Sequence, residues 1–173
     1  MNGHEIHGAG HILHKLDAME SVAGEPMFFD GEFQVGGCLS ATKAWCESGY
    51  KTGGEAGTFH VFDVLTEREW RANDCDRPLV ERKAMLKRLF DESERMDDGW
   101  EWRAGTYGKE PDHPIVEIIE GEWCNDVPEI MDLANRVWAT GGEGLVIKDA
   151  ESVYRRERSK DWLKVKHPRY KAK

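Results

Sequence analysis

Charged side chains stand at both ends of a short apolar run near the carboxyl end of the sequence. The run 145–147 (Leu-Val-Ile) follows Glu143 and Gly144 and is followed by Lys148. A strand that only fills a core needs no charge at either end, so this strand is expected to carry chemistry into a cleft. Glu143 and Lys148 are five residues apart, and a flat strand would aim them at opposite faces. We therefore expect Gly144 to bend or bulge the backbone where the strand begins.

Two pairs of like charges occur at strand spacing. Asp30 and Glu32 lie two residues apart, as do Lys164 and Lys166, so each pair points from one face of its strand. Two parallel ammonium groups repel each other, and a bound phosphate would relieve that repulsion. Paired carboxylates suit a divalent metal, which phosphoryl chemistry also uses.

Lys164 and Lys166 also have a simpler interpretation. Lysine is common on edge strands, where it faces water. In both interpretations the alternating residues Leu163 and Val165 are expected to face inward. The residues alone leave the two interpretations open.

Charge is distributed unevenly along the 173 residues. The net charge is −9, but the segment 154–173 carries +7 and the rest of the chain −16. A basic end on an acidic body suits a polyanion held at one place, although a solvated basic tail would look the same. No run of eighteen apolar residues occurs, so we expect no membrane partner. The four cysteines are scattered and include no C-x-x-C pair, which indicates reduced thiols and a cytoplasmic location.

Hydrophobic periodicity predicts helices and strands in irregular alternation. Helices are expected over 9–21, 41–47, 76–97 and 126–140, and strands over 27–35, 58–65, 114–120, 145–147 and 162–166. Asp76 is expected to cap the third helix with Pro78 in its first turn, and Asp126 to cap the fourth. Because there is no regular βαβ rhythm, the pattern predicts an α+β fold with antiparallel sheets flanked by helices.

Four strand segments in this order resemble the later motifs of the ATP-dependent DNA ligases, in the covalent nucleotidyltransferase superfamily. The segments are Phe-Asp-Gly-Glu (29–32), Phe-His-Val-Phe-Asp (59–63), Glu-Gly-Leu-Val-Ile-Lys (143–148) and Trp-Leu-Lys-Val-Lys (162–166). Pro-Leu-Val-Glu-Arg (78–82) and the stretch from Tyr154 through Arg158 to Trp162 resemble the segments between them. The resemblance covers nearly the whole chain and implies the adenylation-domain fold of phage or bacterial DNA ligases over residues 1–173.

The resemblance also implies roles for six side chains. Phe62 would stack on adenine, Glu32 would lie near the ribose and the metal, and Glu143 would help to bind Mg²⁺ or Mn²⁺. Lys148, Lys164 and Lys166 would contact the nucleotide phosphates and stabilise charge as the α-phosphate is attacked. The implied cofactors are ATP or AMP with the metal, and the implied partner is nicked double-stranded DNA, in DNA repair, replication or recombination.

The nucleophilic lysine of the family, in its K-x-D-G motif, has no counterpart in the sequence. Lys15 begins the nearest imitation, Lys-Leu-Asp-Ala, which lacks the glycine and lies in a predicted helix. The start, Asn-Gly-His-Glu-Ile (2–6), resembles the end of the family's S-R-N-G segment and the residues after it. We expect a domain that is N-terminally incomplete, without the family's OB-fold domain. We expect that such a chain cannot adenylate itself alone, and that it shows marginal stability, self-association or a need for a partner, which would be the missing N-terminal fragment or an OB-fold chain.

Two other functions fit the same residues. One is a relative that acts on RNA, either an RNA ligase or a capping nucleotidyltransferase. The other is a degenerate module that binds nucleotide or DNA without catalysis. The Trp-Leu-Lys-Val-Lys ending and the Phe-Asp pair favour the DNA ligase.

Overall fold

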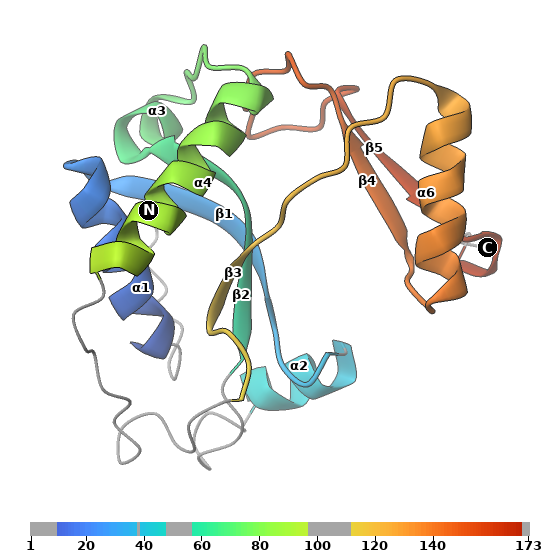
Figure 1. The fold of residues 1–173 in the computed structure, drawn as a ribbon, viewed down its shortest axis with the longest axis horizontal. Coiled ribbons are helices and arrows are strands. Elements are labelled where there is room, and N and C mark those ends of the chain that lie inside the picture. Colours follow the sequence, from blue (N-terminus) through green and yellow to red (C-terminus); the bar gives the residue numbers. More distant parts are fainter. Residues whose placement is uncertain (1–9, 38, 48–56, 97–111, 171–173) are drawn as a thin grey trace.

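The computed structural model describes residues 10–37, 39–47, 57–96 and 112–170. The chain forms two sheets with helices around them, in agreement with the predicted α+β class (Figure 1). A larger part contains β1, β2 and β3 with α1 to α4. A smaller part contains the β4–β5 hairpin and α6.

The predicted elements occur in the predicted order, and the structure adds a short helix, α3, and a 3-10 turn that the sequence pattern does not predict. In chain order, the elements are α1 (Gly10–Ala23), β1 (Met27–Gln34), α2 (Leu39–Glu47), β2 (Thr58–Thr66), α3 (Glu67–Ala72), α4 (Leu79–Met96), β3 (Val116–Ile118), α6 (Val127–Ala139), β4 (Gly144–Lys148), β5 (Trp162–Lys166) and a 3-10 turn (Pro168–Tyr170). The segment 2–6 and the predicted end of the third helix at 97 lie outside the described residues.

The first sheet is mixed, which corrects the prediction of antiparallel sheets. β1 pairs with β2 antiparallel, but β2 pairs with β3 parallel. A parallel pair needs a long crossover, and the chain between β2 and β3 supplies one that includes α3 and α4. The second sheet, β4–β5, is antiparallel as predicted.

The main core lies where α1 and α4 pack on the first sheet. Its most deeply buried side chains come from both helices and from β2: Met19, Val61, Val64, Leu86 and Leu89. The apolar stripe of α4, which includes Leu79, Leu86 and Leu89, therefore faces the core. Lys15 of α1 pairs with Glu94 of α4, and its Nζ lies 4.9 Å from the centroid of the Phe90 ring. This contact ties the two helices together.

Helix α4 begins at Leu79, and this corrects the prediction that Asp76 caps it. Pro78 directly precedes the helix instead of lying in its first turn. The amide of Leu79 donates to the carbonyl of Ser152 at 2.9 Å, and that of Val80 donates to Ala150 at 3.1 Å. The first amides of a helix need acceptors from outside it, and here a distant loop supplies them.

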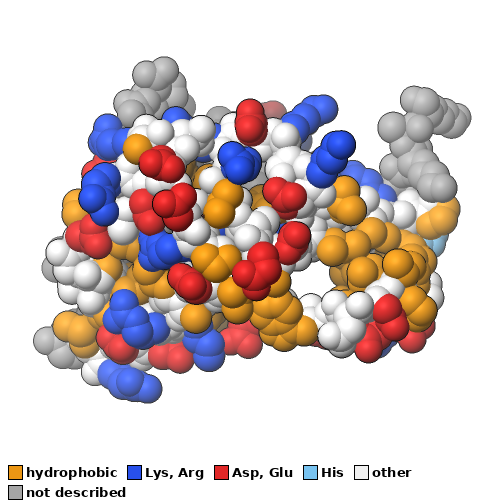
Figure 2. Space-filling view, turned by 90° about the horizontal axis from the view of Figure 1, so that it is seen from above, with side chains coloured by type: hydrophobic (Ala, Val, Ile, Leu, Met, Phe, Trp, Pro, Cys, Tyr) orange, Lys and Arg blue, Asp and Glu red, His pale blue; other side chains and the backbone are white. Residues whose placement is uncertain are grey.

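Helix α6 begins as predicted. Asp126 is its N-cap and accepts a hydrogen bond from the amide of Glu129 at 2.9 Å, and Pro128 lies in the first turn. Among the residues of α6, only Ala134 is fully buried. Hydrophobic side chains gather on the surface of this smaller part (Figure 2). The most exposed are Trp123, Val127, Val146 and Leu163.

The second sheet corrects one further expectation. Leu163 is 56% exposed, so it does not face inward, whereas Val165 is half-buried. Strand alternation fixes which residues share a face, but in a two-stranded sheet it does not decide which residues are covered.

In the described part of the chain, no helix has both the length and the apolar character that crossing a membrane requires.

Candidate nucleotide site between the two sheets

The pairing of β1 with β2 is irregular at Phe62. Asp30 lies opposite Asp63, but the register then shifts, so Phe62 is an extra residue in the ladder. Such bulges re-aim side chains. Gly31 allows the close approach of the strands here, because a Cβ on it would lie 2.5 Å from the carbonyl oxygen of His60.

The hairpin of the second sheet brings Lys148 against this strand. Lys148 of β4 lies opposite Trp162 of β5. The Lys148 Nζ is 3.6 Å from the centroid of the Trp162 ring and 4.5 Å from that of Phe62. An ammonium group over two aromatic faces is stabilised by the ring quadrupoles. Phe62, Lys148 and Trp162 form what we call the aromatic cage.

The ammonium group in the cage is electrostatically unusual. The Lys148 Nζ is buried and has no hydrogen-bond partner. Burial lowers the pKa of Lys148 to about 8, against the opposing attraction of the Asp63 and Asp30 carboxylates. A buried donor without an acceptor carries a desolvation cost, so an incoming acceptor would be favoured here.

Asp30 is held by a hydroxyl from the loop between β4 and β5. The Tyr154 hydroxyl donates to Asp30 Oδ2 at 2.8 Å. Burial raises the pKa of Asp30, and this hydrogen bond acts in the opposite direction. Burial, with the Asp30 carboxylate, also raises the pKa of Tyr154 well above its ordinary value. The Tyr154 ring meets the edge of Trp162, so this loop also supports the cage.

Asp63 is held by a fully buried guanidinium from α4. Arg82 Nε donates to Asp63 Oδ1 at 2.8 Å and Arg82 Nη2 to Oδ2 at 3.0 Å, a bidentate pair. Arg82 Nη1 also donates to the carbonyls of Arg77 and Ser152. The charge and the donors of Arg82 are thus satisfied within the protein, as the burial of an arginine requires.

Glu143 and Lys166 form a second group at the other end of the hairpin. Their side chains form an exposed ion pair, and the hydrogen bond from Lys166 lowers the pKa of Glu143. Lys166 pairs with Gly144 and shares a face with Lys164 and Lys148. A Cβ on Gly144 would lie 2.0 Å from the Val165 carbonyl oxygen, so glycine is needed for this approach.

The predicted site residues therefore fall into separate sets. Phe62 and Lys148 are in contact, and Glu143 is in contact with Lys166. Glu32 and Lys164 are exposed, and in the described part of the chain neither side chain makes a hydrogen bond or ion pair. Strand alternation placed Lys164 and Lys166 on one face correctly, and the register of the hairpin adds Lys148 to that face, whereas no contact joins all six side chains.

Several residues of the site have no role that the sequence predicts. Tyr154, Trp162 and Arg82 stand out there only as parts of segments that resemble the family. The sequence pairs Asp30 with Glu32 as a possible metal ligand, but Asp30 accepts from Tyr154 instead. The alternation of Trp162 with Lys164 is the signal in the sequence that an aromatic ring lies on the lysine face.

The described residues contain no metal site built from protein groups alone. No group of three or more histidine, cysteine, aspartate or glutamate side chains lies close enough there to hold an ion. Glu143 pairs with Lys166, and Glu32 is exposed on β1. Mg²⁺ is often bound by one or two carboxylates together with the phosphates of a nucleotide, so Glu32 and Glu143 stay the predicted ligands.

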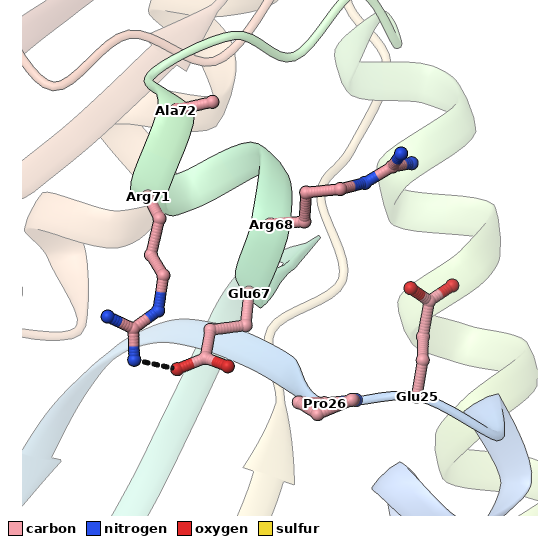
Figure 3. Close-up of a pocket in the computed structure, with 6 residues that line it drawn as sticks. All are labelled: Glu25, Pro26, Glu67, Arg68, Arg71 and Ala72. Atoms are coloured by element: carbon pink, nitrogen blue, oxygen red, sulfur yellow. Dashed lines mark hydrogen bonds and ion pairs between the residues drawn. The ribbon is translucent and has the colours of Figure 1, made fainter.

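A surface depression in the described part of the chain lies elsewhere. It is formed by the lead-in to β1 and by α3, and Arg71 pairs with Glu67 at its wall (Figure 3). None of the predicted site residues lines it: its residues are Glu25, Pro26, Glu67, Arg68, Arg71 and Ala72. It is shallow and mostly bounded by exposed charged groups, so the aromatic cage is the better candidate site.

The basic segment is anchored next to the cage. The Arg156 guanidinium lies 5.0 Å from the Trp70 ring centroid, and its Nε donates to Asn73 Oδ1 at 3.2 Å. Trp70 in turn stacks on Phe28 of β1. The exposed basic residues of this loop are Arg155, Arg156, Arg158 and Lys160.

Comparisons with known proteins agree with the fold and identify the family. A family model described as the ATP dependent DNA ligase domain matches residues 42–166. DNA ligase 4 of Yarrowia lipolytica (strain CLIB 122 / E 150) is 35% identical over 116 residues, which are 65% of this chain and 10% of that protein. The chain thus spans about a tenth of the length of this relative.

Two solved structures share the fold at low sequence identity. One, described as Pmar-Lig_Pre., has a TM-score of 0.71 at 19% identity and covers 96% of this chain and 36% of its own. The other, described as "DNA binding with a minimal scaffold: Structure-function analysis of Lig E DNA ligases", has a TM-score of 0.52 at 17% identity and covers 80% and 46%.

Proposed function

This chain belongs to the family of ATP-dependent DNA ligase domains, and we propose that residues 1–173 are part of an adenylation domain that binds adenylate between its two sheets. The observation that carries the proposal is the buried, unpartnered ammonium of Lys148 beside Phe62. A nucleotide offers both an aromatic base and an anion, which are the two partners that this arrangement lacks.

Different residues of the aromatic cage would bind different parts of the nucleotide. Phe62 would stack on the base, and Lys148 would move from the ring faces to the phosphate, where a charge-assisted hydrogen bond replaces a cation–π contact. Lys164 and Lys166, on the same face, would extend the positive surface along the phosphates. Bound ATP supplies the adenylyl group that family members transfer.

The acidic residues Glu143 and Glu32, the metal ligands that the resemblance implies, would also position other groups. Glu143 holds Lys166 at the end of the hairpin, and this ion pair keeps the Lys166 ammonium in place. Glu32, two residues beyond Asp30 on β1, would lie near the ribose. Lys15 pairs with Glu94 between α1 and α4, so it is a helix contact and not part of this site.

Nicked double-stranded DNA is the partner that we propose for the whole enzyme. The basic loop of β4–β5, fixed at Asn73 and Trp70, would contact backbone phosphates. Such contacts weaken steeply with salt because counterions are released on binding. Binding of nicked DNA at several salt concentrations tests this, and a salt-independent affinity would contradict it.

Calorimetric titration with AMP and with adenosine tests the nucleotide proposal. AMP is expected to bind about tenfold or more tightly than adenosine, since a hydrogen bond between charged groups contributes about 1.5–3 kcal/mol. Phe62→Ala should weaken both ligands, whereas Lys148→Met should weaken AMP alone. Lys160→Met, which removes an exposed charge outside the cage, is the matched control. Equal affinity for the two ligands, unaffected by Lys148→Met, would refute the proposal.

Catalysis is tested separately from binding. Sealing of a pre-adenylated nick does not require the lysine–AMP adduct, so it measures the contribution of this chain on its own. Sealing would show a partial enzyme, and binding without sealing would favour a module that only holds nucleotide or DNA. A covalent adduct formed with labelled ATP on the purified chain would contradict the expectation that it cannot adenylate itself.

A further inference from the structure

Both carboxylates whose charges act on Lys148 are already committed to other donors. Asp63 accepts two hydrogen bonds from the fully buried Arg82. Asp30 accepts one from the Tyr154 hydroxyl. The negative charges of both carboxylates act on Lys148, yet its Nζ forms no hydrogen bond with either of them.

Electrostatic attraction alone would favour an ion pair between Lys148 and one of these carboxylates. A half-buried ammonium normally forms an ion pair with an available carboxylate, because the pair offsets part of its desolvation. Asp63 cannot do so without leaving the Arg82 guanidinium buried and unpaired. Asp30 could do so at a smaller cost, since only one hydroxyl hydrogen bond holds it.

We propose that Tyr154 is a positioning residue that holds the Asp30 carboxylate away from Lys148 and so reserves the Lys148 ammonium for an incoming anion. The inference rests on the proposed role of Lys148 in nucleotide binding and adds the residue that governs it. The groups that face Lys148 are Phe62 and Trp162 through their rings, and Asp30, Asp63, Arg82 and Lys83 through their charges.

Other features support a positioning role. Tyr154 reaches Asp30 from the loop that joins β4 to β5, so its hydroxyl spans the two sheets. Its ring lies against Trp162 and under the Arg82 guanidinium, at 5.7 Å from the guanidinium carbon to the ring centroid. The ring contacts fix the direction of the hydroxyl, and Tyr154→Phe removes the hydroxyl while it keeps those contacts.

The test is a double-mutant cycle with two readouts. The first is the pH midpoint of Lys148 labelling by an amine-reactive reagent, measured by mass spectrometry with the exposed Lys164 as internal reference. The second is AMP affinity by calorimetry at neutral pH. Wild type, Tyr154→Phe, Asp30→Asn and the double variant are compared, and thermal melts check that each one folds.

In Tyr154→Phe, Asp30 is expected to pair with Lys148. The labelling midpoint should rise by at least about one pH unit from its value near 8, and AMP should bind about tenfold more weakly. In the Asp30→Asn background, the same Tyr154→Phe change should alter neither the acid dissociation constant of Lys148 nor its AMP affinity by more than about twofold. A residue with a merely structural role would weaken binding in both backgrounds.

Three outcomes separate the ideas. An unchanged labelling midpoint in Tyr154→Phe overturns the positioning role, even if AMP binds as proposed. An effect of Tyr154→Phe that persists in the Asp30→Asn background also overturns it. The expected midpoints without any AMP binding would support the positioning role and refute the proposed function.

Discussion

Raising the pH from 7 to 9 should release AMP from this protein, and Lys148 is the reason. The pKa of Lys148 lies near 8 because burial disfavours its charged form. Anion binding needs the ammonium, so affinity should be fully present below that pKa and lost as the pH rises through it. A phosphate monoester has its second pKa near about 6, so AMP itself keeps its charge across this range.

The magnitude depends on the fraction of Lys148 that is charged. With a pKa near 8, about 90% is protonated at pH 7 and about 10% at pH 9, so the dissociation constant should rise about tenfold. An unperturbed lysine, with a pKa near about 10.4, would give almost no change. Because a bound phosphate favours the charged form, AMP binding near pH 8 should also take up about half a proton.

Isothermal titration calorimetry in two buffers of different ionisation enthalpy measures both quantities. Adenosine should show no pH dependence, since it carries no phosphate. Lys148→Met should remove the dependence for AMP, whereas a dependence that remains would point to Lys83, whose pKa burial also lowers. Tyr154 does not interfere, because its pKa lies above its ordinary value. AMP affinity that stays constant from pH 7 to 9 would refute the reasoning.

Urea denaturation tests three further predictions. Gly144→Ala should lower the free energy of unfolding by about 1–3 kcal/mol, because the added Cβ would clash with the Val165 carbonyl. In the control Gly121→Ala the added Cβ would meet nothing within 4 Å, so the free energy of unfolding should change by less than about 0.5 kcal/mol. Equal effects of the two substitutions would argue against the clash. Arg82→Met should cost about 3–5 kcal/mol because it leaves Asp63 buried and unpaired, and adding Asp63→Leu should recover part of the loss; a cost below about 1 kcal/mol would contradict the burial. Asp126→Ala should cost about 1 kcal/mol as a lost helix cap, and the mid-helix control Asp132→Ala should cost less.

The elements could be predicted from the sequence because their signals are local. The α4 stripe, the Asp126 cap and the strands at 27–34, 58–66 and 162–166 follow from periodicity and capping chemistry within a few residues. The parallel pairing of β2 with β3 could not be predicted in this way. It depends on where a crossover of mixed helix and loop returns the chain, which no short pattern specifies.

The site was predicted only in part, for the same reason. Alternation put Lys164 and Lys166 on one face, and the family resemblance selected Phe62 and Lys148. The partners that set the chemistry are remote in sequence: Tyr154 reaches Asp30 across 124 residues, and Arg82 reaches Ser152 across 70. Such contacts arise from tertiary packing, so the commitment of Asp30 and Asp63 became visible only in the structure.

The way helix α4 begins has a consequence for movement between the two parts of the molecule. Its first amides, on Leu79 and Val80, find their acceptors on the loop after β4, and not in a side chain beside them. An outward movement of the β4–β5 hairpin would break these two hydrogen bonds and destabilise the first turn of α4. The two hydrogen bonds therefore oppose separation of the two parts, and hydrogen exchange at the two amides would measure how often they separate.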